Sequence, residues 1–495
     1  MLDKIDVNLD DIKQVCKKHS FDVDHFWVEI NNRFNLNKSK NAGERSKRCG
    51  VPLIVLFQIA ISFPFFNKNS IQSFFKSQFQ KMIKCNKTPL YRFLQDNFFN
   101  WRKSMYKLNS EIEAKSGSDE NKKHPTALII DDSVLAKTGR RIEGVTKVHD
   151  HVTNKYVVGF KLLALCWFNG SYSRFLDFSL VSEKRKIKLS RNKPQFNRKR
   201  DKKSVAFQRK TELKKDKITL SCQLFAEAVK NKFIPDYLLT DTWFTCAELI
   251  NKVRNCTDNR THFLGMIKNG RRKFTYNGSE YTLSELRKTL MNRAKRCSKY
   301  KSRYIIVDCY LNTVGNVRLL FSRFHGNKKW VTLITTEVNM SYIKAIEVYS
   351  IRWNIEIGFK EMKQLLGLGK SQANDFASQT AHTSCVFIAH SLLADCKYHE
   401  QYQSLGILFE KVQEQYTALL TMDKLLNLIE YILKTIGDHL GGIENITLEE
   451  LLNSNEYSEF KKMLEKSLTF NVEFAKESLK DYNQKDTECL YAIGA

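Results

Sequence analysis

The spacing of apolar residues changes along the chain and divides it into segments of different predicted structure. Up to about residue 120, and again after residue 372, apolar positions recur at helical intervals. Between these segments lie short, continuous apolar runs that are typical of buried strands. The pattern therefore predicts a mixed fold, with a sheet in the middle of the chain and helices before and after it.

Two of the apolar runs end in acidic residues. The run 127–130 is followed by Asp131 and Asp132, and the run 237–240 is followed by Asp241. Both runs suit central strands that deliver acids at their carboxyl ends. A single acid at a strand end is as often a turn or capping residue, so these acids gain weight only together with other signals.

Further strands are expected on both sides of Asp241. Residues 156–168 and 172–181 flank the pair Asn169-Gly170, which is a strong hairpin signal. Helices are predicted at 218–232 and 246–253. A mostly β insertion follows, with one helix at 283–295. Strands within this insertion or next to it are predicted at 262–268, 273–282, 302–308, 317–324 and 330–335.

The first 120 residues are predicted to form a small helical bundle. Near Thr88 a capping residue, a proline and an apolar face indicate a helix that leaves Tyr91, Arg92, Arg102 and Lys103 facing outward. The bundle could present this helix to DNA or could be a lid without DNA contact. Its other helices are expected at 9–19, 24–34, 51–63 and 69–84, and helices near the end of the chain at 381–396, 406–420 and 424–437.

Charge points to a polyanionic partner. The chain has 81 Lys and Arg against 53 Asp and Glu, a net charge of +28. Residues 183–217 alone hold 16 basic and 4 acidic residues, which favours contact with a nucleic-acid backbone over a solvated tail. Lys137 belongs to a second basic segment, after the first acids, and is expected to contact DNA.

The 12 cysteines show no metal-finger spacing and are interpreted as reduced thiols of a cytoplasmic protein. The start of the sequence is acidic and polar, so no signal peptide is expected. Residues 51–66 are uncharged and apolar, but the run is too short to span a membrane and contains Pro52 and Pro64. We therefore expect no membrane partner, and an association with the nucleoid only through DNA.

The segment 349–363 carries the most informative group of side chains. On one helix, Tyr349, Arg352, Glu356 and Lys363 would share a narrow stripe beside an apolar stripe. A carboxylate with two cations and a phenol suits phosphate chemistry beside a metal ion. The alternative is a solvated helix face with ion pairs one turn apart.

The spacing Y-x2-R-x3-E-x6-K resembles the signature of DDE transposases of the insertion sequence 4 type, which are ribonuclease H-like. The resemblance covers about residues 126–372 and implies a catalytic triad of Asp132, Asp241 and Glu356. Asp131 competes with Asp132, which is preferred because the family's first acid commonly precedes Ser or Thr. Three such carboxylates would repel one another unless they bound divalent cations, and two Mg²⁺ or Mn²⁺ ions are expected.

The resemblance also implies the activity. It predicts the transposase of a bacterial insertion sequence, which binds terminal inverted repeats, cleaves and joins DNA strands, and acts as a homodimer in a synaptic complex. Tyr349 and Arg352 would contact DNA near the cleaved end, and Lys363 a phosphate. From residue type alone, Trp243 or Trp353 is expected to stack on an extruded base. Two alternatives remain, a metal-dependent nuclease without strand transfer and a non-catalytic DNA-binding descendant of a transposase.

The predicted fold class is α+β/mixed, with a ribonuclease H-like core. Its segments are a helical DNA-binding region (1–120), a first core part with the basic insert (121–268), a β-rich insertion (269–324), a second core part with the helix of the third acid (325–375) and a helical C-terminal region (376–495).

Overall fold

The computed structural model describes residues 51, 53–66, 70–76, 86–116, 124–183, 187, 194–414 and 458. The helices expected at 9–19, 24–34 and 424–437, with parts of those at 69–84 and 406–420, lie outside the described residues. No described helix is long and apolar enough to cross a membrane.

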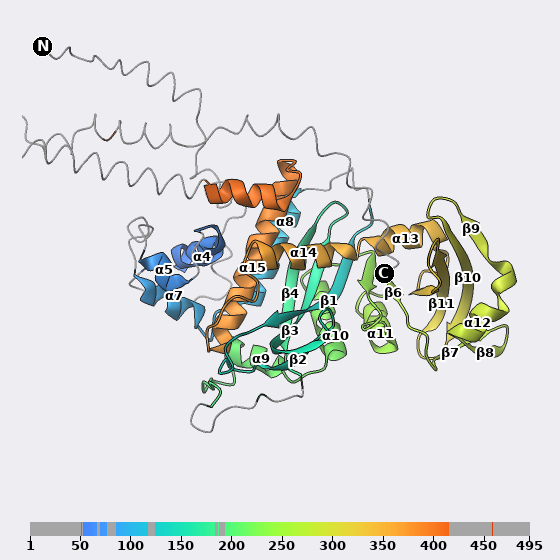
Figure 1. Cartoon of the computed structure of the whole chain (residues 1–495), viewed down its shortest axis with the longest axis horizontal. Helices are drawn as coiled ribbons and strands as arrows, with labels where there is room; N and C mark the ends of the chain where they lie inside the picture. The colour runs from blue at the N-terminus through green and yellow to red at the C-terminus, as the bar shows by residue number, and fades with distance from the viewer. Residues whose placement is uncertain are drawn as a thin grey trace, which may run out of the picture.

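A twelve-stranded mixed sheet runs through the described chain in the order β2-β3-β1-β5-β6-β12-β11-β10-β7-β8, with β4 beside β3 and β9 beside β10 (Figure 1). Strands β1, β5 and β6 are parallel to one another and the other pairs are antiparallel. The strands are β1 (Ala127–Ala136), β2 (Thr146–Asp150), β3 (Lys155–Phe168), β4 (Ser173–Val181), β5 (Tyr237–Thr240), β6 (His262–Met266), β7 (Lys273–Tyr276), β8 (Ser279–Thr282), β9 (Lys295–Cys297), β10 (Ser302–Leu311), β11 (Gly315–Phe324) and β12 (Val331–Thr335).

Helices cover both faces of the sheet, which confirms the predicted mixed fold class. They are α4 (Leu53–Ser62), η1 (Phe63–Phe66), α5 (Ile71–Phe75), α7 (Lys87–Leu94), α8 (Trp101–Ser116), α9 (Val205–Glu212), α10 (Lys217–Lys230), α11 (Ala247–Cys256), α12 (Leu283–Thr289), η2 (Met291–Arg293), α13 (Tyr342–Ser350), α14 (Trp353–Gln364) and α15 (Phe376–His399).

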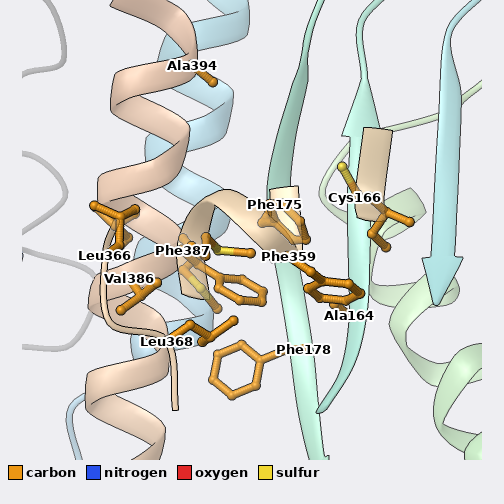
Figure 2. Packing of buried hydrophobic residues seen from close by; sticks show 14 of the residues in the cluster. Ala164, Cys166, Phe175, Phe178, Phe359, Leu366, Leu368, Val386, Phe387 and Ala394 are labelled. Atoms are coloured by element: carbon orange, nitrogen blue, oxygen red, sulfur yellow. The ribbon is translucent and has the colours of Figure 1, made fainter. Parts of the chain in front are cut away.

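Alternate residues of the central strands pack into two separate hydrophobic cores, one on each face of the sheet. In β1, Ile129 packs into the core shared with α14 and α15, whereas Ile130 packs into the core shared with α10 and α11. Figure 2 shows part of the first core, where Phe175 of β4 meets Phe359 of α14 and Phe387 of α15. The two-residue repeat of the strands thus decides which side chains face α14.

The hairpin between β3 and β4 confirms the prediction made from Asn169-Gly170. Gly170 has a φ of 100°, which favours glycine. The Asn169 side-chain oxygen accepts hydrogen bonds from the backbone N–H groups of Ser171 and Tyr172, at 3.0 Å each. Turn chemistry alone was therefore sufficient to locate this hairpin.

Several local predictions were wrong. Strand β1 continues to Ala136, so its acids lie within the strand and not at its end. The largely polar strand β2 was not predicted. The expected single helix around Glu356 is two helices, α13 and α14, which meet at Ile351 and Arg352 (Figure 1).

Arg102 does not face outward as expected. Its guanidinium donates hydrogen bonds to Asp177 at 2.8 Å and to Glu212 at 2.9 Å, and so ties α8 to β4 and α9. Both carboxylates are largely buried, which explains why the arginine turns inward.

Candidate active site

Parallel pairing of β1 with β5 brings two acids to neighbouring positions. Ile130 lies beside Thr240, the last residue of β5, so Asp131 of β1 and Asp241, the residue that follows β5, each come directly after this pair of neighbours. The Asp241 carboxylate accepts a hydrogen bond from the backbone N–H of Trp243 at 2.8 Å, which fixes the turn after β5. The strand order therefore places these two carboxylates at one point of the sheet.

Asp131 and Asp132 face opposite sides of the sheet. Asp131 pairs with Ala164 of β3, which belongs to the core beneath α14, whereas Asp132 pairs with Leu163, which belongs to the core beneath α10. Since Glu356 is on α14, the strand alternation puts Asp131, and not Asp132, on the side of the third acid.

Arg352 connects that side of the site. Its guanidinium donates to Asp131 at 3.3 Å and binds the Glu356 carboxylate at 2.7 Å. Arg352 is only 9% exposed, and its Nε atom has no hydrogen-bond partner among the described residues. A buried cation between two carboxylates offsets charge that would otherwise oppose folding.

Burial and charge crowding raise the pKa of both strand acids. Burial is the main reason that the pKa of Asp131 rises to about 7, and the charge of Asp241 adds to it, against the opposing effect of Arg352. Burial likewise raises the pKa of Asp241. A cation bound between these two buried carboxylates would favour their ionised forms and reduce their mutual repulsion.

Asp132 has cations of its own. Its carboxylate lies 3.1 Å from the Lys217 ammonium at the start of α10 and 3.4 Å from the Lys161 ammonium of β3. The Lys161 side chain is only 2% exposed. These two lysines were not identified from the sequence, because nothing in their spacing separates them from the many surface lysines.

Tyr349 and Lys363 complete the group that the sequence singled out on this segment. Tyr349 is buried, and its hydroxyl donates to the carbonyl of Thr240 at 3.3 Å, so it supports the end of β5. The Lys363 ammonium donates to the Ser133 hydroxyl at 2.7 Å, and burial lowers its pKa. Both side chains are therefore engaged with the strands that carry the acids.

Trp243 lies at the open rim of the site. It is 59% exposed, and the Lys268 ammonium stands 4.3 Å from the centre of its ring. The His151 ring, from the turn between β2 and β3, is 5.7 Å away at an interplanar angle of 33°. Lys268 and His151 were missed in the sequence, where neither belongs to a motif. Trp353 is half-buried, with the Arg352 guanidinium 5.4 Å from its ring.

Lys137 is not placed to bind DNA, contrary to the prediction. It is buried, its ammonium donates to the carbonyls of Gly369 and Ser371 at 2.7 and 2.8 Å, and burial lowers its pKa to about 7. It anchors the loop after α14 to β1. Arg92, by contrast, is exposed on α7, which lies on the far side of α15 from β1 (Figure 1).

The described part of the basic stretch 183–217 uses many of its cations inside the protein. Arg200 binds both Glu143 and Asp375, and Lys210 binds Glu143 at 2.6 Å. Arg209 lies 3.1 Å from Glu212. The prediction of a phosphate-binding surface can therefore apply only to the exposed remainder, which includes Lys199, Lys202, Lys203 and Lys214.

The carboxylates at this site suit a hard divalent cation in their chemistry. Asp131 and Asp241 supply oxygen ligands from adjacent strand positions, and their raised pKa values reflect crowded negative charge. Within the parts of the chain that the structure describes, no three His, Cys, Asp or Glu side chains are grouped as metal ligands. Glu356 is instead bound to Arg352.

Two models of known protein families match parts of the chain. Residues 77–268 match the DDE superfamily endonuclease model, and residues 184–392 match the transposase DDE domain model. A search of curated proteins found no match. Together the two matched ranges contain Asp131, Asp241 and Glu356. The two matches overlap at residues 184–268, and the chain is therefore a nucleic-acid-cleaving enzyme of the DDE type with DNA as its partner.

Proposed function

We propose that this protein is the transposase of a bacterial insertion sequence of the insertion sequence 4 type. It binds the terminal inverted repeats of its element, cleaves the DNA strands at their ends and transfers them to target DNA. We also propose that two copies of the protein form a homodimer in a synaptic complex, which holds the two ends of the element together.

The observation that carries the proposal is the contact of Arg352 with Asp131 and Glu356 beside Asp241. The Y-x2-R-x3-E-x6-K residues are not a solvated stripe, because Tyr349 and Arg352 are buried against the strands of the acids. A purely structural helix would not need to bring its arginine and glutamate to an acid that lies within the central strand.

We assign the first acid of the triad to Asp131, with Asp241 and Glu356 as the others. The sequence favoured Asp132, and that assignment remains the alternative. The assignment to Asp131 is supported by its position on the α14 side of β1 and by its neighbour Asp241. Asp132 instead orients Lys161 and Lys217 on the opposite side.

DDE transposases generally use divalent metals, and we propose Mg²⁺ or Mn²⁺, as two ions, at Asp131, Asp241 and Glu356. Such ions supply activation of a water or a DNA 3′ hydroxyl and stabilisation of the leaving oxygen. Arg352 holds Glu356 in reach of the strand acids, and Lys363 adds positive charge near Ser133. We propose that Trp243, which is exposed at the rim, stacks on an unpaired base.

The test is cleavage of labelled DNA that carries the inverted repeats flanking this reading frame, with Mg²⁺ or Mn²⁺. The wild type is compared with Asp131→Ala, Asp132→Ala and Glu356→Ala. Metal-dependent nicks at the repeat ends that vanish in the Asp131 and Glu356 variants support the proposal, and joined products separate a transposase from a nuclease. Tight binding of the repeats without any nicking by the wild type would contradict it.

A further inference from the structure

The β-rich part of the chain that follows β6 is unusually basic. Residues 269–330, which form β7 to β11 and α12, contain 15 Lys and Arg but only 3 Asp and Glu. This segment, which we call the β module, lies at the end of the sheet remote from β1 (Figure 1). Its charge is therefore not explained by the carboxylates of the candidate active site.

Three arginines of the β module form a row across adjacent strands. In the strand register, Arg303 of β10 lies opposite Arg323 of β11 on one side and Arg296 of β9 on the other. Residues directly opposite each other in antiparallel strands share a face of the sheet and lie about 5 Å apart. The arginine row, Arg296-Arg303-Arg323, therefore spans about 10 Å on one face.

The carboxylates of the β module, which the structure describes throughout, are engaged elsewhere and do not neutralise this row. Of the three acids in the β module, Glu280 binds Lys273 at 3.1 Å, Asp308 binds Arg318 at 2.7 Å, and Glu285 caps α12 by accepting from Thr282. Among the described residues, none lies within salt-bridge distance of the row. Like charges directly opposite in a sheet are destabilising, so the row opposes folding unless an anion binds it.

An aromatic residue supports one end of the row. The Arg323 guanidinium lies 5.4 Å from the centre of the Trp330 ring, and that of Arg287 from α12 lies 5.9 Å from it. The Nε atom of Arg287 is buried without a hydrogen-bond partner in the described chain. Trp330 thus orients two guanidinium groups through cation–π contacts.

We propose that the arginine row binds the phosphate backbone of duplex DNA at a place separate from the cleaved phosphodiester. The guanidinium groups of the row lie close enough together to bind neighbouring phosphates of a DNA backbone. Guanidinium groups bind phosphate in a bidentate way that lysine cannot reproduce. The proposal rests on the proposed function only in taking DNA as the ligand.

The experiment compares the triple variant Arg296→Gln, Arg303→Gln, Arg323→Gln with a matched control. The control, Lys288→Gln, Lys328→Gln, Lys329→Gln, removes the same charge from exposed lysines of the β module that lie outside the row. Binding to fluorescent duplex DNA is measured from low to high salt. The plot of log K against log salt has a negative slope. We expect the row variant to make this slope less steep by about 2 to 3, and the control to make it less steep by less than 1.

Two further readouts separate the possible outcomes. Cleavage at saturating DNA should stay within about twofold of the wild type, and the melting temperature of the row variant should not fall, since like charges have been removed. Binding to duplex RNA is measured in the same way. Equal salt slopes for the row variant and the control on DNA would overturn the proposal, as would a row variant that loses affinity for duplex RNA but not for duplex DNA. Failure of the wild type itself to nick repeat DNA would contradict the proposed function and leave the comparison of slopes intact.

Discussion

Arg352 binds Glu356 one helical turn further along the chain, at 2.7 Å, and reaches across to Asp131 with the same guanidinium. Arg352 lies at the junction of α13 and α14, so the junction positions the arginine between a strand acid and a helix acid. The turn between the two helices is therefore part of the candidate active site and not merely a connection.

Replacement of Glu356 by Gln should abolish metal-dependent cleavage and leave DNA binding within about threefold of the wild type. The amide keeps the shape of the side chain but loses the charge that a cation requires. Single-turnover cleavage and a binding titration measure the two effects separately. Glu361→Gln, which changes another acid of α14, is the control, and it should keep cleavage because Gln can still accept from His390. Full cleavage by Glu356→Gln would remove it from the triad.

The two adjacent acids of β1 should differ sharply when each is changed to Asn. Asp131→Asn should lower single-turnover cleavage by at least about 10³-fold, the usual size of effect for a group in the catalytic machinery. Asp132→Asn should lower it by no more than about tenfold, through less well ordered Lys161 and Lys217. The reverse order of effects would restore Asp132 as the first acid.

Trp243→Ala should weaken the reaction on DNA with an unpaired base at the cleavage position by about 10- to 100-fold, since stacking on one base contributes about 1 to 3 kcal/mol. Trp243→Phe should recover most of this loss because it keeps an aromatic face. The rates are compared on substrates with and without the unpaired base. Equal losses for Ala and Phe would indicate that the indole serves another purpose, such as holding Lys268.

Exposed and paired cations of the basic stretch should respond differently to neutralisation. For duplex DNA, the triple variant Lys199→Gln, Lys202→Gln, Lys203→Gln should make the negative slope of log K against log salt less steep by up to about 3. Arg200→Gln should instead lower the stability to urea, because Arg200 holds Glu143 and Asp375. An unchanged salt slope in the lysine variant would show that these side chains are only solvated.

Glu143 should make the fold sensitive to acid. It is buried, and hydrogen bonds from Arg200, Lys210 and the Phe376 backbone overcome the effect of burial and lower its pKa from 4.5 to about 2. Because the folded state holds this proton less tightly than the unfolded state, the stabilisation is complete above about pH 4.5 and is lost as the pH falls towards 2.

Glu143→Gln should therefore lower the free energy of unfolding by about 3 kcal/mol at pH 7, as expected for one partner lost from a buried ion pair. The difference from the wild type should shrink at pH 3. Urea unfolding at both pH values measures it. Glu280→Gln, at the exposed pair with Lys273, is the control and should change stability by less than about 1 kcal/mol. A difference that is the same at both pH values would argue against the charge of Glu143.

The sequence predicted the strands and hairpin of the core because continuous apolar runs and Asn169-Gly170 are local signals. It could not predict β2, which is polar and depends on pairing with β3. Ile351 and Arg352 are compatible with a continuous helix, so the junction of α13 and α14 was not visible either. Long-range pairing and packing decide these elements.

The sequence predicted which types of residue form the candidate site, but not which face of the sheet each of them lies on. That Asp131 and Asp132 point to opposite faces follows from strand geometry, but which face carries α14 depends on the whole fold. Lysines are seldom buried, so the inward turn of Lys137 had no signal in the sequence. Arg102 was missed for the same reason.

Adjacent strands of the sheet are hydrogen-bonded without a break from β1 through β5, β6, β12 and β11 to β10. The acids lie at one end of this plate and the arginine row at the other. Their separation is consequently fixed by backbone pairing and not by a flexible hinge. The row shares a face of the sheet with the core beneath α10 and α11, whereas Asp131 faces α14, so a duplex bound at both places would have to pass around an edge of the sheet.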